Sequence, residues 1–235
     1  MSEQFLRAEM LLGGDAMEKL SQSHVAVFGL GGVGSWCAEA LCRCGVGKLT
    51  LVDEDTVSES NLNRQLCATV SALSLPKAEV MARRLLDINP QLTVIPVCAR
   101  YEESSRERFF TEKFDYIADC IDLVSCKLDL IETAISRGIP IISSLGTGNK
   151  MDAEALRISD ISQTMGCPFA RVMRKELRSR GIGTLPVVWS PEPAMKPQGG
   201  GEPPPGRRSI PGSLVWVPAS AGMLISSHIV KSLIK

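Results

Sequence analysis

The sequence predicts an α/β protein with a doubly wound, Rossmann-like, mainly parallel sheet and a C-terminal extension that continues this sheet. Three observations support this fold class. Short apolar, β-branched runs alternate with segments of helical periodicity through the first 150 residues, as in parallel sheets joined by crossover helices. A glycine-rich turn, Gly29-x-Gly31-x-x-Gly34, follows the first apolar run. The length of 235 residues is within the range of one α/β domain.

The first half begins with an amphipathic helix over residues 8–23 and a buried strand over residues 24–30. A helix over residues 35–46 is expected to end near Gly45. A later helix is expected to stop at Asn89-Pro90, because proline cannot continue a helix. The further strands predicted in this half are residues 48–55, 92–99, 115–122 and 139–146, and its further helices are residues 77–89 and 127–138.

The pattern changes after residue 150. The elements predicted next are a strand running into a connector at residues 152–164, a helix at residues 168–181 and a strand at residues 183–190. Residues 191–212 are rich in proline and glycine, which predicts a mobile loop whose function the sequence does not reveal. Residues 213–230 are apolar, but Pro218, His228 and several serines favour a strand followed by a buried helix over a membrane span.

We therefore expect one domain over residues 1–235, with a nucleotide-binding half at residues 1–150 and a substrate-side half at residues 151–235. The formal net charge of zero excludes a global basic field that would attract nucleic acid, so any such contact needs a local patch. None of the 8 cysteines forms a C-x-x-C zinc pair, and most fit buried thiols of a reducing compartment. The N-terminus has no signal-peptide pattern, which favours a cytoplasmic protein without a membrane segment.

The glycine turn has the composition of a phosphate-binding loop. Gly29 allows the tight turn, Gly31 and its neighbour Gly32 let the backbone approach a phosphate, and Gly34 lets helix and strand pack closely. Asp53 ends the next predicted strand, where an acidic residue binds ribose hydroxyls. These residues predict a nucleotide and leave NAD and ATP open.

Polar and cationic residues after the second strand favour ATP. Asn61, Arg64, Gln65 and Lys77 follow Asp53, and cations placed there neutralise charge as a bond to phosphorus breaks. A dehydrogenase transfers hydride and has no use for them, so an NAD-binding oxidoreductase is disfavoured. Asp122 ends the fourth predicted strand at the same sheet edge, where a carboxylate can hold Mg²⁺ on the phosphates. Alternatively, Arg64 and Lys77 are solvated surface charges and Asp122 caps the following helix.

Four motifs together resemble the ThiF/MoeB/ubiquitin-activating-enzyme superfamily: "GLGGVGSWCAEAL", "LVDEDTVSESNLNRQ", "PKAEVMARRLLDINP" and "DCIDLVSCK". Members of this superfamily adenylate a carboxylate with ATP. The resemblance implies that Asp53 binds ribose, that Asn61, Arg64 and Lys77 bind phosphate, and that Asp122 is associated with magnesium. It also implies that Arg7, in "FLRAEMLLGG", crosses a homodimer interface into the ATP site of the partner. A non-catalytic nucleotide-binding adaptor would not need Asp122 and the cations together.

The second half is similar to the tRNA threonylcarbamoyladenosine dehydratases, on "LGTGNKMDAEALRISDISQTMGCPFARVMRKELRSRGI". That branch implies an ATP-dependent adenylating ligase or cyclase that activates the threonine carboxylate of a modified adenosine in tRNA and closes a ring with loss of water. The alternative is adenylation of the C-terminus of a small ubiquitin-like sulfur-carrier protein. Carrier-loading branches often have zinc pairs and a late catalytic cysteine, and here Cys167 is the only late cysteine, for which a structural role is preferred. Sulfur or electron partners stay unidentified.

A tRNA substrate implies a phosphate-binding surface. The helix predicted at residues 168–181 has the basic residues for it: Arg171, Arg174, Lys175 and Arg178. Arg207 and Arg208 in the predicted loop are further candidates for ordering on the substrate. An ordinary solvated helix face explains the same basic residues equally well.

Overall fold

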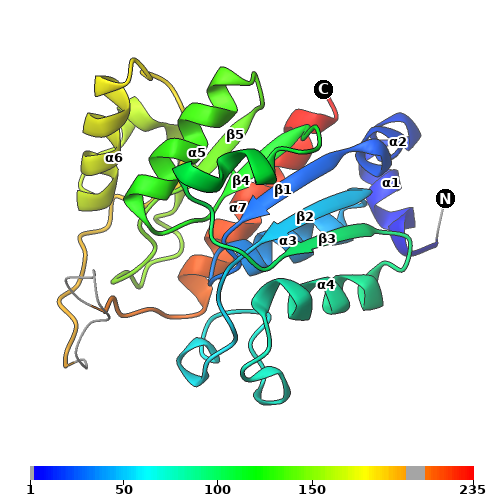
Figure 1. Ribbon diagram of the computed structural model, residues 1–235, viewed down its shortest axis with the longest axis horizontal. Coiled ribbons are helices and arrows are strands. Elements are labelled where there is room, and N and C mark those ends of the chain that lie inside the picture. The colour runs from blue at the N-terminus through cyan, green and yellow to red at the C-terminus, as the bar shows by residue number, and fades with distance from the viewer. Residues whose placement is uncertain (1–2, 200–209) are drawn as a thin grey trace.

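A computed structural model of the protein describes residues 3–199 and 210–235, and these form one mixed sheet with helices on both faces (Figure 1). The sheet is seven-stranded, in the order β3-β2-β1-β4-β5-β7-β6. All neighbouring strands pair in parallel except β6, which is antiparallel to β7. The strands are β1 (His24–Phe28), β2 (Lys48–Val52), β3 (Thr93–Val97), β4 (Tyr116–Asp119), β5 (Ile141–Ser144), β6 (Arg157–Asp160) and β7 (Pro186–Trp189). The predicted fold class is confirmed.

Seven α-helices lie in the described part of the chain. They are α1 (Leu6–Leu12), α2 (Gly14–Gln22), α3 (Gly34–Arg43), α4 (Lys77–Ile88), α5 (Val124–Ser136), α6 (Pro168–Ser179) and α7 (Trp216–Leu233). Short 3-10 helices are η1 (Glu3–Phe5), η2 (Glu59–Asn61), η3 (Val70–Ala72), η4 (Glu103–Phe109) and η5 (Ile161–Gln163). Across residues 3–199 and 210–235, no helix is both long and apolar enough to cross a membrane.

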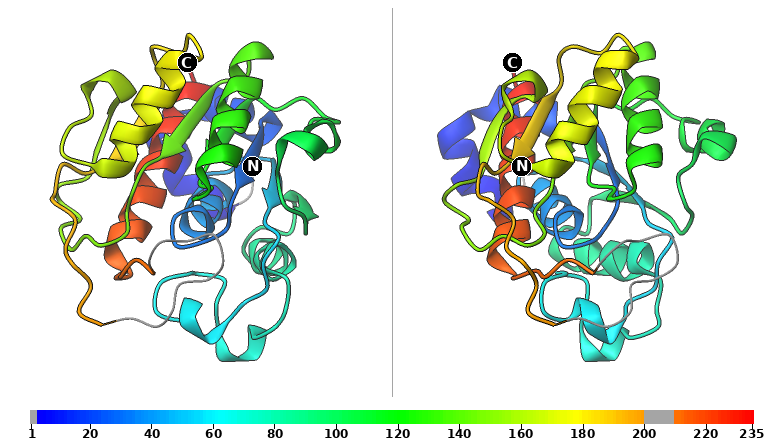
Figure 2. Two further views of the ribbon diagram at one scale, coloured as in Figure 1. Left: turned by 60° about the vertical axis from the view of Figure 1, so that its left-hand side comes forward. Right: turned by 90° about the vertical axis from the view of Figure 1, so that its left-hand side faces the viewer.

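The core has two layers because strand side chains alternate between the faces of the sheet. Val25 and Val27 of β1 point into a cluster with α2, α3, α4 and α7, whereas Ala26 and Phe28 point into a cluster with α5 and α6. Figure 2 shows these two layers from the side, with α5 and α6 together on one face and α7 on the other. The central strands read as continuous apolar runs because both faces are covered.

The strand order places the topological switch point of the sheet between β1 and β4. The connection after β1 leads to β2 on one side, and the connection after β4 leads to β5 on the other side. The two connections therefore diverge at the carboxyl ends of β1 and β4. The glycine turn lies there, between β1 and α3. Open α/β sheets bind their ligands at this kind of switch point.

Two predicted elements differ from the structure. The first amphipathic segment is two helices, α1 and α2, because Gly13 adopts φ 84 between them. The strand predicted from Ser213 was wrong, since α7 begins at Trp216 directly after an irregular segment. Pro218 is compatible with that start, because backbone N–H groups in the first turn of a helix have no intrahelical partner to lose.

Candidate functional site

The glycine turn is fixed by contacts that leave no room for side chains at two positions. Gly29 has φ 88, and a Cβ added there would lie 2.7 Å from the carbonyl oxygen of Cys120 in the β4–α5 connection. A Cβ on Gly34 would lie 1.7 Å from the Gly29 carbonyl oxygen. Gly31 is open by comparison, with the Gln65 Nε2 at 3.8 Å from its added Cβ. The turn is therefore as tight as the glycine spacing predicted, with an accessible middle.

Asp53 lies directly after β2 and holds the turn in place. One carboxylate oxygen accepts a hydrogen bond from the Leu30 backbone N–H at 2.6 Å, and the other accepts from the Asp55 N–H at 2.9 Å. Burial raises the pKa of the Asp53 carboxyl, and the charge of nearby Lys77 opposes this increase. Each carboxylate oxygen still has a free lone pair, which is what binding to a ribose hydroxyl requires.

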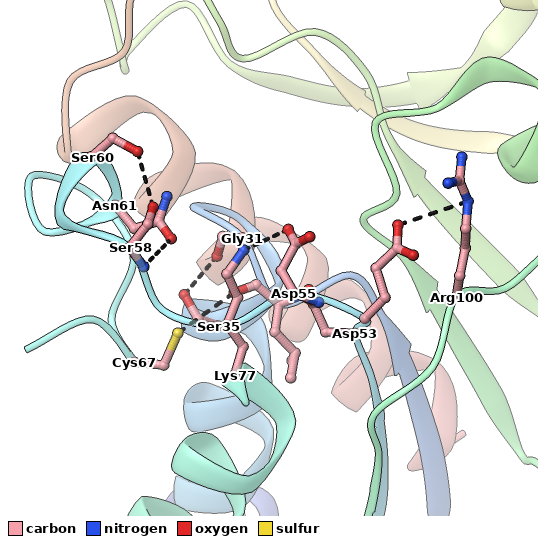
Figure 3. A network of polar contacts seen from close by, with 12 residues as sticks. Gly31, Ser35, Asp53, Asp55, Ser58, Ser60, Asn61, Cys67, Lys77 and Arg100 are labelled. Atoms are coloured by element: carbon pink, nitrogen blue, oxygen red, sulfur yellow. Dashed lines mark hydrogen bonds and ion pairs between the residues drawn. The ribbon is translucent and has the colours of Figure 1, made fainter. Parts of the chain in front are cut away.

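The segment after η2 is hydrogen-bonded to the glycine turn. The Ser35 hydroxyl donates to the Gly31 carbonyl oxygen at 2.7 Å and accepts from the Leu66 N–H at 3.1 Å. The Cys67 thiol contacts the Leu30 carbonyl oxygen at 3.7 Å. Figure 3 shows the Ser35 side chain pointing toward Gly31, with Cys67 on the neighbouring segment. The segment that carries Arg64 and Gln65 is therefore joined to the glycine turn through its next two residues, Leu66 and Cys67.

Arg64 lies beside the turn, with its guanidinium half-buried. The Nη1 donates to the Ser60 carbonyl oxygen at 2.8 Å and to the Asn63 Oδ1 at 2.9 Å. An added Cβ on Gly32 would lie 3.5 Å from the Arg64 Cγ, and the Trp36 indole holds the Arg64 carbonyl oxygen at 3.2 Å. Burial lowers the pKa of Arg64, but a guanidinium keeps its charge in proteins. The guanidinium has five N–H donors, and the bonds to Ser60 and Asn63 use only two of them, so the other donors can bind a ligand.

The two amides behave differently. Gln65 is 8% exposed, and its Oε1 has no hydrogen-bond partner within the described residues. This amide therefore has unused hydrogen-bonding capacity next to Gly31. Asn61 is also buried, but its Oδ1 accepts from the Ser58 backbone N–H at 3.1 Å and so closes the first turn of η2. The structure thus gives Asn61 a local capping role that the sequence reasoning did not predict.

Lys77 is the first residue of α4 and is only 4% exposed. Its ammonium contacts the Asp55 carboxylate at 2.8 Å, and Figure 3 shows the two side chains pointing toward each other. The solvated surface charge considered from the sequence is therefore wrong for Lys77. A buried ammonium needs a paired anion, which this structure supplies through Asp55, a residue absent from the predicted site.

Asp122 lies in the short connection between β4 and α5, at the same edge as the glycine turn, and is exposed. The described residues contain no cluster of three His, Cys, Asp or Glu side chains suited to a metal. This pattern does not disfavour Mg²⁺, which proteins often hold through one or two carboxylates together with substrate phosphates. Asp122 fits that mode, since it follows the strand adjacent to β1.

A completely buried ion pair lies under this connection, and the sequence reasoning missed it. The Lys127 ammonium contacts the Asp119 carboxylate at 2.7 Å and the Ser143 Oγ at 3.0 Å, and both charged side chains are 0% exposed. The Ser143 hydroxyl donates to the same carboxylate oxygen at 2.6 Å. The signal in the sequence was a lysine on the apolar face of a predicted helix, four residues before Ile131, but solvated lysines have the same spacing.

Arg7 does not reach this site within one chain. It is exposed on α1, and neighbouring Phe5 lies 3.7 Å from an added Cβ on Gly45, which precedes β2. That position is at the amino ends of the strands, opposite the glycine turn (Figure 1). A role for Arg7 in an ATP site therefore requires a second copy of the chain.

The basic helix is present as α6, and its cations differ in their surroundings. Arg171, Lys175 and Arg178 are exposed, at spacings that place them on one face. Arg174 is half-buried and donates to both the carbonyl oxygen and the hydroxyl of Thr164. Arg174 thus anchors the connector before α6. Arg207 and Arg208 lie outside the described residues.

Cys167 precedes α6 and is 5% exposed, with its Sγ 3.0 Å from an added Cβ on Gly146. All eight cysteines of the chain are free thiols. Burial raises the pKa of the thiols of Cys42 and Cys67 to about 11, which keeps them protonated and unreactive at neutral pH. For Cys167, its burial agrees with the structural role preferred from the sequence.

Comparisons with known proteins agree with this geometry. The sequence model of the ThiF family matches residues 5–235. The tRNA threonylcarbamoyladenosine dehydratase of Bacillus subtilis is 40% identical over 244 residues, covering 100% of this chain and 96% of that protein. Crystal structures of E. coli tRNA N6-threonylcarbamoyladenosine dehydratase, TcdA, with AMP and with ATP have TM-scores of 0.90 and 0.89 at 32% identity, covering 99% of this chain and 94% of theirs. The molybdopterin-synthase adenylyltransferase of Haemophilus influenzae is 35% identical over 171 residues, or 73% of this chain and 68% of that protein.

Proposed function

The chain belongs to the ThiF family, and we propose that it catalyses the ATP-dependent dehydration of threonylcarbamoyladenosine in tRNA. The observation that carries this proposal is the full-length similarity to the B. subtilis dehydratase, which includes the substrate-side half where adenylating enzymes differ. The E. coli structures with AMP and ATP support ATP as the co-substrate. Since tRNA is the substrate, the cytoplasmic location expected from the sequence fits the activity.

The chemistry follows from the weakness of a carboxylate as an electrophile. The threonine carboxylate attacks the α-phosphorus of ATP, and pyrophosphate leaves. An oxygen or nitrogen of the carbamoyl group then attacks the acyl adenylate, the ring closes, and AMP leaves with one of the carboxylate oxygens. Water is lost in total from the nucleoside, and no enzyme nucleophile is required. The burial of Cys167 and the protonated thiols of Cys42 and Cys67 are consistent with this route.

The described residues suit the first step. Asp53 would hold the ribose, and the backbone around Gly31 would approach the phosphates. Lys77 would exchange its contact with Asp55 for the triphosphate, and the free donors of Arg64 would stabilise charge on the phosphorus. Bound Mg²⁺ would neutralise phosphate charge, and Asp122, exposed at this edge of the sheet, would be the carboxylate that holds it.

Mass spectrometry of nucleosides tests this function. Substrate tRNA incubated with the protein and ATP should yield threonylcarbamoyladenosine that is lighter by one water. Arg64→Ala and Asp122→Ala should keep the fold by circular dichroism and lose this turnover. Arg83→Ala is the matched control, because the Arg83 side chain is 67% exposed in a surface pair with Glu79. Full turnover in either site variant would contradict the assigned roles.

We also propose a homodimer in which Arg7 completes the partner's ATP site. Helix α1 exposes an unusual amount of apolar surface, with Leu6 at 49%, Met10 at 74% and Leu11 at 87%. Mixing the inactive variants Arg7→Ala and Arg64→Ala should restore activity, because a mixed dimer contains one site with neither defect. No recovery after subunit exchange would exclude an Arg7 contribution across the interface.

The exposed face of α6 would bind the phosphate backbone of tRNA. Reversing charge at Arg171 and Lys175 should weaken tRNA binding and flatten its salt dependence. Arg174 is less suited to this role, since Thr164 already accepts its hydrogen bonds. Unchanged affinity in the double charge reversal would remove α6 from the tRNA interface.

The second candidate function is adenylation of a carrier protein, favoured by the similarity to the molybdopterin-synthase adenylyltransferase. It predicts ATP–pyrophosphate exchange stimulated by a small carrier protein. It also predicts no change of mass in the tRNA nucleoside. The two assays therefore separate the candidates.

A further inference from the structure

The start of α7 exposes a large aromatic side chain next to the candidate ATP site. Trp216 is 46% exposed, and two neighbouring apolar residues, Val215 at 38% and Met151 at 50%, are exposed with it. Tryptophan is usually largely buried, so an exposed ring in a small apolar group indicates a binding surface. None of the residues assigned to ATP binding belongs to this group. We name Met151, Val215 and Trp216 together the Trp216 platform.

The ring of Trp216 is held in one orientation. Its indole N–H donates to the Met151 carbonyl oxygen at 2.7 Å, so the polar edge of the ring is satisfied within the protein. The exposed part of the side chain is therefore apolar ring surface. A flat, fixed ring of this kind loses little conformational freedom when it stacks on a ligand.

The partner of the indole is also held rigidly. The Met151 and Asp152 backbone N–H groups donate to the Glu192 carboxylate at 2.9 and 3.1 Å. The preceding residue, Lys150, is 3% exposed, and its ammonium donates to the Ser190 and Glu192 carbonyl oxygens at 2.8 and 2.7 Å. The connector that supports Trp216 is thus fixed to the end of β7, and the platform is preorganised.

The platform borders the glycine turn. The Pro218 Cβ lies 3.1 Å from an added Cβ on Gly32, and Pro218 is two residues after Trp216 in the same helical turn. On the other side, the Asn63 Nδ2 donates to the Ser213 carbonyl oxygen at 3.0 Å, which joins the Arg64 segment to the residues before α7. Alternate Cα atoms of a helix are about 5.4 Å apart, so the Trp216 backbone is roughly 12 Å or less from the Gly32 backbone.

We infer that the Trp216 platform stacks on the adenine base of the tRNA nucleoside whose carboxylate is activated. This inference rests on the proposed function. The carboxylate of that nucleoside is joined to the base through a carbamoyl and an amino-acid unit, a peptide-like linker that spans about 7 Å when extended. A base on Trp216 therefore places its carboxylate within reach of a phosphate on the glycine turn.

The chemistry of the platform fits a base better than a peptide. Proteins recognise single-stranded RNA by stacking splayed bases on aromatic side chains. An extended peptide instead needs backbone donors and acceptors along its length, and the Trp216 indole N–H is already used by Met151. The nearby Arg64 guanidinium and the exposed cations of α6 complement the charge of the RNA backbone.

The test compares Trp216→Ala, Trp216→Phe and the control Leu86→Ala, which removes a 42% exposed leucine from α4. The substrate is an anticodon stem-loop that carries threonylcarbamoyladenosine. Stacking of one base on an aromatic ring predicts that Trp216→Ala raises the KM for the stem-loop roughly 5- to 150-fold. Trp216→Phe should retain most of the activity, and the affinity for ATP should stay unchanged in all three variants.

Intrinsic fluorescence gives a second readout. Trp189 is 2% exposed and Trp36 is half-buried, so Trp216 is the exposed fluorophore among the three tryptophans, all of which the structure describes. The stem-loop should quench wild-type emission more strongly than ATP does, and Trp216→Phe should lose this difference.

The outcomes test the inference and the proposed function on which it rests separately. If the wild type dehydrates the stem-loop but Trp216→Ala has an unchanged KM, the inference is wrong and the proposed function stands. If the wild type leaves the nucleoside unchanged, both are overturned. If the nucleoside is unchanged and Trp216→Ala weakens the ATP–pyrophosphate exchange that a carrier protein stimulates, the platform binds a peptide instead.

Discussion

The buried pair between Lys127 and Asp119 allows a prediction with a magnitude. Replacing Lys127 by methionine keeps most of the side-chain volume and removes the ammonium from a carboxylate that is 0% exposed. Losing one partner of a buried pair costs about 3–5 kcal/mol. The Ser143 hydroxyl and the Ile121 N–H still donate to Asp119, at 2.6 and 3.2 Å, so we expect the lower end, about 3 kcal/mol. For a chain of this size that lowers Tm by roughly 6–12 °C.

The pH dependence of this loss identifies its cause. Without the ammonium, the folded variant buries an uncompensated carboxylate, whereas the unfolded chain keeps this carboxylate in water, so the cost is that of burying a negative charge. The stability difference from wild type should therefore be largest above neutral pH and shrink as the pH falls toward 5. Adding Asp119→Asn to Lys127→Met removes the charge, and should recover most of the loss and abolish this dependence.

Urea denaturation followed by circular dichroism, at several pH values, measures these quantities. Lys175→Met is the control, because Lys175 is an exposed lysine on α6 and should change the free energy of unfolding by less than about 0.5 kcal/mol. A loss below about 1 kcal/mol for Lys127→Met near neutral pH would refute the reasoning. A loss that grows as the pH falls would also refute it.

Three further predictions concern the glycine turn, its acidic partner and the histidines. Gly34→Ala should lose ATP binding and destabilise the fold by several kcal/mol, because its Cβ would lie 1.7 Å from the Gly29 carbonyl oxygen. The control Gly183→Ala, whose added Cβ has no atom within 4 Å, should leave the free energy of unfolding unchanged in the same urea denaturation. Asp53→Asn should weaken ATP binding by roughly tenfold in calorimetry, since a charged acceptor is lost. Burial raises the pKa of Asp53, so as the pH is lowered the affinity of the wild type for ATP should begin to fall at a higher pH than it would with an ordinary aspartate. The pKa values of His24 and His228 are lowered from 6.5, chiefly by burial, so their contribution to stability is present above pH 6.5 and lost as the pH falls. Between about pH 7.5 and 5.5 the free energy of unfolding should fall by at most about 1.4 kcal/mol per pH unit for each histidine, and a slope that His24→Asn and His228→Asn leave unchanged would contradict this cause.

The strands and the nucleotide turn were predictable because their signals are local. The apolar runs that form β1, β2, β4 and β5 are buried on both faces, so their sequences need no knowledge of their neighbours. Gly34 is required by a clash with the Gly29 carbonyl oxygen, which lies within the same strand–turn–helix unit. The strand expected at Ser213 failed for the opposite reason, since an apolar run before a helix is compatible with either state until packing decides.

The contacts that tune the site were not predictable, because each joins residues far apart in the sequence. Lys77 and Asp55 are 22 residues apart, Lys127 and Ser143 are 16 apart, and the Trp216 indole contacts a carbonyl 65 residues away. A sequence pattern can place Lys77 at the correct edge of the sheet, but whether its ammonium is solvated or buried depends on how the surrounding elements pack over it. Burial explains why Lys77 is paired with Asp55, because a buried ammonium needs an anion beside it. The chain thus combines a turn encoded within ten residues with charges whose environment only the assembled sheet provides.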